Sequence, residues 1–125
     1  MIIDTTVWVH LFRKEDKARE FLLSLKGEIV VSRITVMELV YGRSSSRDVA
    51  SMWKQFKSLG VAVKEIDEGI SAIAGTIFER YFPTKGIGLL DAFVAATALV
   101  RNEKLVTHNV KHFRFIEDLD LIVPY

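Results

Sequence analysis

Short apolar and β-branched runs alternate with segments of helical periodicity along the whole chain, and this alternation limits the possible folds more than any other feature. Five runs have the composition of strands, namely residues 2–3, 28–32, 61–66, 104–107 and 121–123. Strands separated by helices favour a parallel sheet with helices on both faces and right-handed crossovers. The pattern therefore predicts an α/β fold, although it leaves the order of the strands open.

Capping and breaking residues indicate where the helices begin and end. One helix, from Asp91 to Val100, is apolar nearly all round, which predicts a helix buried in the centre of the fold. A short polar and aromatic helix or turn is expected between the last two strands. The other expected helices are Thr5–Phe12, a segment from a cap at Asp16 to Gly27, Thr35–Tyr41 ended by Gly42, a segment from a cap at Ser46 to Gly60, and a long helix opened by Asp67 and ended by Pro83 and the Gly86-Ile87-Gly88 loop.

The composition restricts the class of protein. A length of 125 residues suits one domain, expected over residues 1–125. Half of the residues are apolar and the mean hydropathy is +0.22, so some apolar surface is expected to meet a partner, in an oligomer. A net charge of +1 does not by itself indicate a nucleic-acid binder. The absence of cysteine excludes disulfides, thiol nucleophiles and thiolate metal sites.

The sequence shows neither a secretory signal pattern nor an apolar run approaching the roughly 18 residues that a membrane span needs. We therefore expect no membrane association and a cytoplasmic location.

An aspartate stands directly after the first expected strand. Asp4 follows Ile2 and Ile3 and precedes two threonines. The carboxyl edge of an open α/β sheet is where ligands bind, because the strand ends and the following helices leave a crevice there. Taken alone, Asp4 is also a suitable helix N-cap, which is a structural alternative.

Two further acids, Glu38 and Asp91, interrupt apolar runs and can reach the same edge of the sheet. Three carboxylates in a partly buried crevice repel one another unless a cation lies among them. Oxygen ligands without cysteine favour Mg²⁺ or Mn²⁺, and a water bound to such an ion can attack a phosphodiester. The alternatives are that Glu38 is a surface residue and that Asp91 only caps its helix.

Other polar residues are weaker candidates. Thr6 and Thr107 are either ordinary strand-end hydroxyls or groups that hold a carboxylate or a water. His108 and His112 are four residues apart, a spacing that can bind a metal on a helix, but no third nitrogen or sulfur ligand is evident. Several basic residues are either solvated or in contact with phosphate: Arg13, Lys14, Arg43, Arg47, Lys85 and Lys111.

Four blocks of the sequence resemble the motifs of PIN-domain ribonucleases and, more narrowly, of the VapC toxins of bacterial and archaeal toxin–antitoxin pairs. They arrive in order and span the chain, so they are specific together although each alone is weak. The blocks are residues 2–8 (IIDTTVW), 35–42 (TVMELVYG), 90–92 (LDA) with the alanine-rich helix that follows, and 106–113 (VTHNVKHF).

The resemblance implies a PIN-like three-layer fold, with a parallel sheet of about five strands between helices. It implies an Mg²⁺- or Mn²⁺-dependent endoribonuclease whose metal ligands match Asp4, Glu38 and Asp91. Thr6 matches the hydroxyl position two residues after the first aspartate, and Asn109 matches the fourth acidic position. An asparagine there removes a negative charge, so one firmly bound ion is expected. The implied partners are an RNA substrate, a cognate VapB-like antitoxin and a second copy in a homodimer.

Other enzyme classes with a strand that ends in aspartate fit less well. A phosphotransferase of the haloacid dehalogenase type needs a second acid at position 6, which is Thr6. A response-regulator receiver needs an early acidic pair and a late lysine, and a dinucleotide site needs G-x-G-x-x-G after the first strand. The alternative from another class is a catalytically weak RNA-binding or protein-interaction domain of the same fold, with Asn109 marking lost activity.

Overall fold

Five short parallel strands form one sheet in the order β3-β2-β1-β4-β5, and seven helices surround it. The computed structural model describes residues 1–125. The strands are β1 (Ile2–Ile3), β2 (Val30–Ser32), β3 (Ala62–Lys64), β4 (Leu105–Val106) and β5 (Leu121–Ile122). The helices are α1 (Thr5–Phe12), α2 (Asp16–Ser24), α3 (Arg33–Tyr41), α4 (Ser46–Leu59), α5 (Glu68–Lys85), α6 (Leu89–Arg101) and α7 (Val110–Phe113). The α/β fold and the five strands predicted from the sequence are confirmed.

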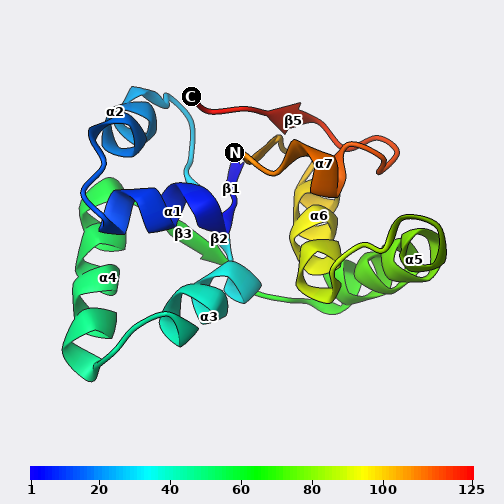
Figure 1. Cartoon of the computed structure of the whole chain (residues 1–125), viewed down its shortest axis with the longest axis horizontal. Helices are drawn as coiled ribbons and strands as arrows, with labels where there is room; N and C mark the ends of the chain where they lie inside the picture. Colours follow the sequence, from blue (N-terminus) through cyan, green and yellow to red (C-terminus); the bar gives the residue numbers. More distant parts are fainter.

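The central strands β1 and β4 are apolar and buried on both faces, because each face of the sheet is covered by helices. Ile2 points into one core, with Val30 and Leu105, and Ile3 points into the other. The first core lies against α5, α6 and α7, and the second lies against α1 to α4. Figure 1 shows α1, α2 and α4 on one side of the strands and α5, α6 and α7 on the other. The molecule therefore has three layers.

The central position of α6 follows from its composition. Ala92 and residues 94–98 are fully or almost fully buried, and the small alanine side chains let this helix pack closely against its neighbour α5. The predicted buried helix is confirmed, although α6 begins at Leu89, two residues before Asp91. None of the helices combines the length and the apolar character that crossing a bilayer requires.

Pro83 does not end α5, contrary to the prediction. The helix continues to Lys85 and ends at Gly86, whose φ of 66° is the left-handed conformation that glycine adopts readily. Pro83 lies in the last turn, where its missing N–H costs one hydrogen bond, and the N–H of Gly86 still donates to the carbonyl of Phe82 at 2.9 Å.

The order in which the chain adds strands to the sheet changes sides at β1, between β1 and β4. From β1 the chain adds β2 and β3 on one side, and then adds β4 and β5 on the other. Such a switch point leaves a crevice at the carboxyl ends of the two strands. Asp4 follows β1 and Thr107 follows β4, so the topology places both residues at this crevice.

Candidate active site

Asp4 is buried at the switch point, with 5% of its surface exposed. It occupies the N-cap position of α1, but its side chain makes no capping hydrogen bond. Instead, the hydroxyl of Thr107 donates to Asp4 Oδ2 at 2.8 Å, and the backbone N–H of Asn109 donates to that same hydroxyl at 2.9 Å. The carboxylate is therefore fixed from β4 and is not used to cap its helix.

Glu38 lies in the middle of α3 and is half-buried, so it is not an ordinary surface residue. Thr5, the first residue of α1, donates its hydroxyl hydrogen to Glu38 Oε1 at 3.2 Å. This contact directs the glutamate toward the start of α1, where Asp4 is also found.

Asp91 is the third residue of α6, and the N-cap of that helix is Gly88. Asp91 therefore does not cap the helix, although it benefits from the positive end of the helix dipole. Gly88 packs closely against it, since a Cβ added there would lie 3.2 Å from Asp91 Oδ2. His112 Nδ1, from the end of α7, lies 3.5 Å from the same oxygen.

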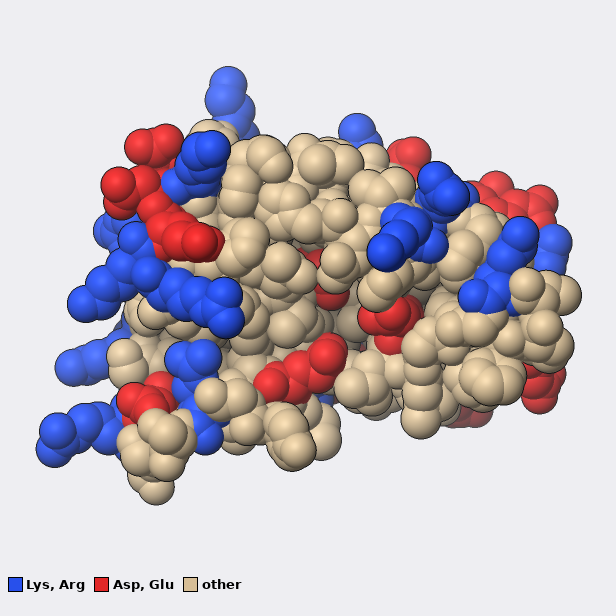
Figure 2. Space-filling model, in the orientation of Figure 1, with Lys and Arg blue, Asp and Glu red and all other residues tan.

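The three carboxylates lie close enough to influence one another electrostatically. Burial raises the pKa of Asp4, against a hydrogen bond from Thr107 that lowers it. Burial also raises the pKa of Glu38, and the charges of Asp4 and Asp91 raise it further. The pKa of Asp91 is raised by burial and then by the charge of Asp4. In Figure 2 acidic side chains gather around a hollow in the middle of the visible face.

No lysine or arginine forms an ion pair with any of these three acids. As the side chains lie, no group of three or more His, Asp or Glu residues converges closely enough to hold a metal ion. Each acid instead has its own partner, namely Thr107, Thr5 or His112. A set of oxygen donors with raised pKa values and no lysine or arginine partner suits a divalent cation that keeps much of its hydration, as Mg²⁺ does.

Asn109 and Thr6 belong to the same region. The side-chain amide of Asn109 donates to the hydroxyl of Thr6 at 3.3 Å, which links α1 to the start of α7. This contact leaves the carbonyl oxygen of the Asn109 side chain available as an oxygen ligand.

The two histidines of the fourth block are not paired. His108 precedes α7 and packs against His10 and Tyr125, whereas His112 lies beside Asp91. Sequence reasoning missed two contacts of the site, the one between Thr5 and Glu38 and the one between His112 and Asp91. The hydroxyl of Thr5 directly follows Asp4, which was a usable signal, but the approach of His112 depends on how α7 packs on α6.

The basic residues separate into two groups. Lys85 and Lys111 line a cavity of about 280 Å³ that Asp91 also lines. Lys14 lies elsewhere, and the Arg43 guanidinium packs over the ring of Phe12 at 4.9 Å.

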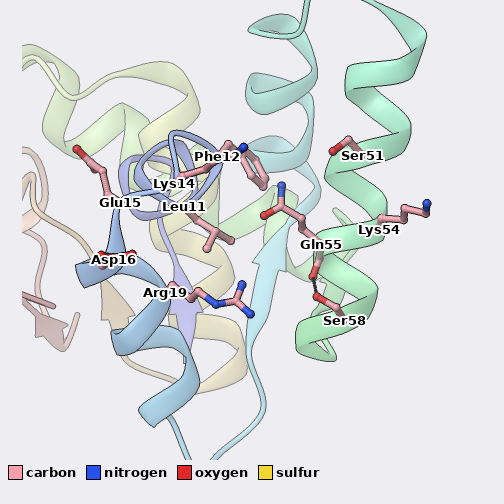
Figure 3. Close-up of a pocket in the computed structure, with 10 residues that line it drawn as sticks. All are labelled: Leu11, Phe12, Lys14, Glu15, Asp16, Arg19, Ser51, Lys54, Gln55 and Ser58. Atoms are coloured by element: carbon pink, nitrogen blue, oxygen red, sulfur yellow. Dashed lines mark hydrogen bonds between the residues drawn. The ribbon is translucent and has the colours of Figure 1, made fainter.

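A cavity of about 640 Å³ has none of the three site acids in its lining. It lies between the end of α1, the start of α2 and α4, with Arg19 and Gln55 among its lining residues (Figure 3). None of the three clustered carboxylates lines it, so we do not place the chemistry there. A third cavity, of about 420 Å³, adjoins Glu38 and is otherwise apolar, lined by Ile34, Met37, Tyr41 and Leu90.

Residues 1–117 match the PIN domain family. The chain is a PIN-domain protein of the VapC group. It is similar to Ribonuclease VapC19 of Mycobacterium tuberculosis, with 34% identity over 122 residues that cover 94% of this chain and 95% of that protein. Ribonuclease VapC10 of the same species is 32% identical over 123 residues, which cover 95% of this chain and 90% of that protein.

The fold is similar to that of solved toxin–antitoxin structures. The crystal structure of VapBC2 from Rickettsia felis, bound to a DNA fragment from its promoter, superposes with a TM-score of 0.82. The identity is 26%, and the match covers 97% of this chain and 96% of that chain. The PIN-like fold that the four sequence blocks implied is thereby confirmed.

Proposed function

We propose that this protein is a divalent-metal-dependent endoribonuclease and the toxin of a toxin–antitoxin pair. The observation that carries the proposal is that Asp4, Glu38 and Asp91, from three separate elements, lie near enough to one another at the switch point of the sheet for their charges to interact. The similar proteins VapC19 and VapC10 are ribonucleases by name, and this supports RNA as the substrate.

We assign Asp4, Glu38 and Asp91 as ligands of one Mg²⁺ or Mn²⁺ ion. The donors are hard oxygens, burial raises their pKa values, and no lysine or arginine pairs with them. When bound, such an ion makes a coordinated water more acidic and offsets the charge that develops on the phosphate. Asn109 adds a neutral oxygen in place of a fourth charge, so we expect a single firmly bound ion.

The remaining residues of the site hold its parts in position. Thr107 fixes Asp4 from β4, and Thr5 orients Glu38 across the gap between α1 and α3. The contact between Thr6 and Asn109 holds the loop after β4 against α1. Groups of this kind orient ligands and keep them from relaxing away from one another.

The proposed partner in the cell is a VapB-like antitoxin, because VapBC complexes are among the structures that this fold resembles. We also propose a homodimer and a cytoplasmic location, where RNA is accessible. The exposed apolar side chains beside Glu38 provide surface for a protein contact, since Met37 is 60% and Tyr41 94% exposed. Light scattering of the purified protein tests the dimer: a mass near 28 kDa, twice the 14.2 kDa of one chain, supports it, and a monomer contradicts it.

The activity is tested by incubating the purified protein with RNA in Mg²⁺, in Mn²⁺ and in a chelator. We expect internal cleavage that needs the divalent ion and falls at least about 100-fold in Asp4→Asn and in Asp91→Asn, both of which keep the side-chain shape. Circular dichroism confirms that the variants are folded. Cleavage by both variants at the rate of the wild type would rule out the assigned site. RNA binding by the wild type without cleavage would favour a binding domain of the same fold.

A further inference from the structure

Two cavities of different chemistry border the acids. One lies beside Asp91, between the α5–α6 loop and α7, and contains Lys85 and Lys111. The other lies beside Glu38 and has no basic residue in its lining. We propose that the cavity with Lys85 and Lys111 is a subsite for a backbone phosphate of the RNA, next to the bond that is cut. This inference rests on the proposed function, because it concerns the path of the same substrate.

The lining of this cavity carries an excess of positive charge. Lys85 and Lys111 form no ion pair with any carboxylate, and they line the same small cavity. Their two ammonium groups outnumber the single carboxylate of the lining, Asp91, and this excess of positive charge favours an anionic occupant. Figure 2 shows basic side chains bordering the central acidic group on its upper right side, where Figure 1 places α7 and α5.

The cavity with Lys85 and Lys111 also has room for an occupant. The lip of the cavity is the Gly86-Ile87-Gly88 loop, and a Cβ added at Gly86 would meet no atom within 4 Å. The space beside Gly86 at this lip is therefore open. The cavity, at about 280 Å³, is also lined by Asp91 and His112, so an occupant would lie directly beside Asp91, one of the three proposed metal ligands.

The other cavity supplies the contrast. Ile34, Met37, Tyr41 and Leu90 can cover an apolar surface, but they cannot neutralise a phosphate. The phosphates of an RNA strand that passes Asp91 are therefore better accommodated on the side of Lys85 and Lys111. Lys85 also lies in the last turn of α5, where a positive charge stabilises the helix end, so a variant must separate this structural role from RNA binding.

The test measures binding of a fluorescent single-stranded RNA by fluorescence anisotropy, in an Asp4→Asn background that prevents cleavage. The test variant is Lys85→Gln with Lys111→Gln. The matched control is Lys26→Gln with Lys57→Gln, which removes the same charge from exposed lysines after α2 and in the last turn of α4. Because Lys57 is also in the last turn of a long helix, the control repeats the helix-end change made at Lys85.

We expect the test variant to bind RNA about tenfold more weakly or worse. The negative slope of log affinity against log salt should become shallower by roughly 1.4, which is about 0.7 for each lost phosphate contact on a single strand. The control should match its parent, and Lys85→Arg with Lys111→Arg should retain binding. With Asp4 intact, the glutamine variant should raise KM and leave kcat nearly unchanged.

Equal RNA affinity and salt slope in the test and control variants would overturn the subsite, and would point to an acidic segment of a protein partner as the occupant. A parent protein that binds no RNA would overturn both the subsite and the proposed function. Lysine-dependent binding without any cleavage in divalent ions would support the phosphate subsite and contradict only the catalytic assignment, so the two failures are distinguishable.

Discussion

At the scale of single residues, the hydroxyl of Thr107 joins the two strands on which the site depends. It donates to the buried carboxylate of Asp4 and accepts from the backbone of Asn109. A buried carboxylate that loses its donor is costly to the folded state and free to turn away from a bound ion. We therefore propose that Thr107 is a positioning residue, which acts through Asp4 rather than on the substrate.

Thr107→Val tests this role, because valine keeps the shape and removes the hydroxyl. We expect metal affinity and RNA cleavage to fall by about 10- to 100-fold, as is typical when a group that holds a metal ligand is lost. Thr107→Ser should retain most of the activity. The matched control is Thr97→Val, a buried threonine whose hydroxyl donates to the carbonyl of Phe93 within α6. If Thr107→Val is as active as the control Thr97→Val, the positioning role of Thr107 is contradicted.

The raised pKa of Asp91 gives a prediction about pH. A carboxyl whose pKa is raised in the folded state holds its proton there after the unfolded chain has lost it. The contribution of Asp91 to stability therefore falls as the pH rises above the usual range of an aspartate, and levels off above its folded pKa. In a chelator, the unfolding free energy of the wild type should fall relative to Asp91→Asn across this acidic range. A difference independent of pH, measured by urea titration, would show that the pKa of Asp91 is not raised.

The closeness of the acids was easier to predict from the sequence than the hydroxyl groups that contact them. The proximity of Asp4 and Thr107 follows from two parallel strands ending at one edge of the sheet, so it could be expected. The position of Thr5 directly after Asp4 was a signal that its hydroxyl lies near the acids, but its choice of Glu38 as partner depends on how α3 packs against α1. The separation of His108 from His112 similarly follows from α7 beginning only at Val110.

At the scale of elements, α6 carries Asp91 and its packing sets where that carboxylate lies. The helix packs mainly on α5, through alanines that permit a close approach. Periodicity and apolar composition were sufficient to predict this helix. They were not sufficient to predict the end of α5, because a proline in a last turn removes only one hydrogen bond and the glycine that follows sets the real end.

Ala95→Leu should show that α6 positions the site. Ala95 is completely buried, and a larger side chain in a packed core costs about 1–3 kcal/mol of unfolding free energy. We expect this loss together with reduced cleavage at a temperature where the variant is still folded. Val100→Ala, at a partly exposed position of the same helix, is the control and should retain cleavage. Full activity in a destabilised Ala95→Leu protein would mean that Asp91 does not depend on this packing.

At the scale of the whole molecule, the order of the strands creates the site. The switch between β1 and β4 brings the first and last thirds of the chain together, so Asp4 meets Thr107 across 103 positions of sequence. The sequence predicted the class of fold and the two helical layers. It could not predict the strand order, because the strands are short and similarly apolar and no local signal distinguishes their neighbours.

Binding of a divalent ion should stabilise the whole protein. At an ion concentration 100 times the dissociation constant, a single site adds about 2.7 kcal/mol to the unfolding free energy. We expect Mn²⁺ to raise the melting temperature of the wild type and to leave that of Asp91→Asn nearly unchanged. Calorimetry with Ca²⁺ and with a chelator as controls separates this effect from ionic strength. An equal rise in both proteins would place the ion elsewhere.

The most direct test of the proposed site is the position of a bound ion in crystals soaked in Mn²⁺. The anomalous difference density should contain one strong peak within coordination distance of Asp4 and Asp91, directly or through a bound water, with Glu38 on its other side. A peak at another place on the molecule, or none at a Mn²⁺ concentration that supports RNA cleavage, would contradict the assignment of these carboxylates as the metal site.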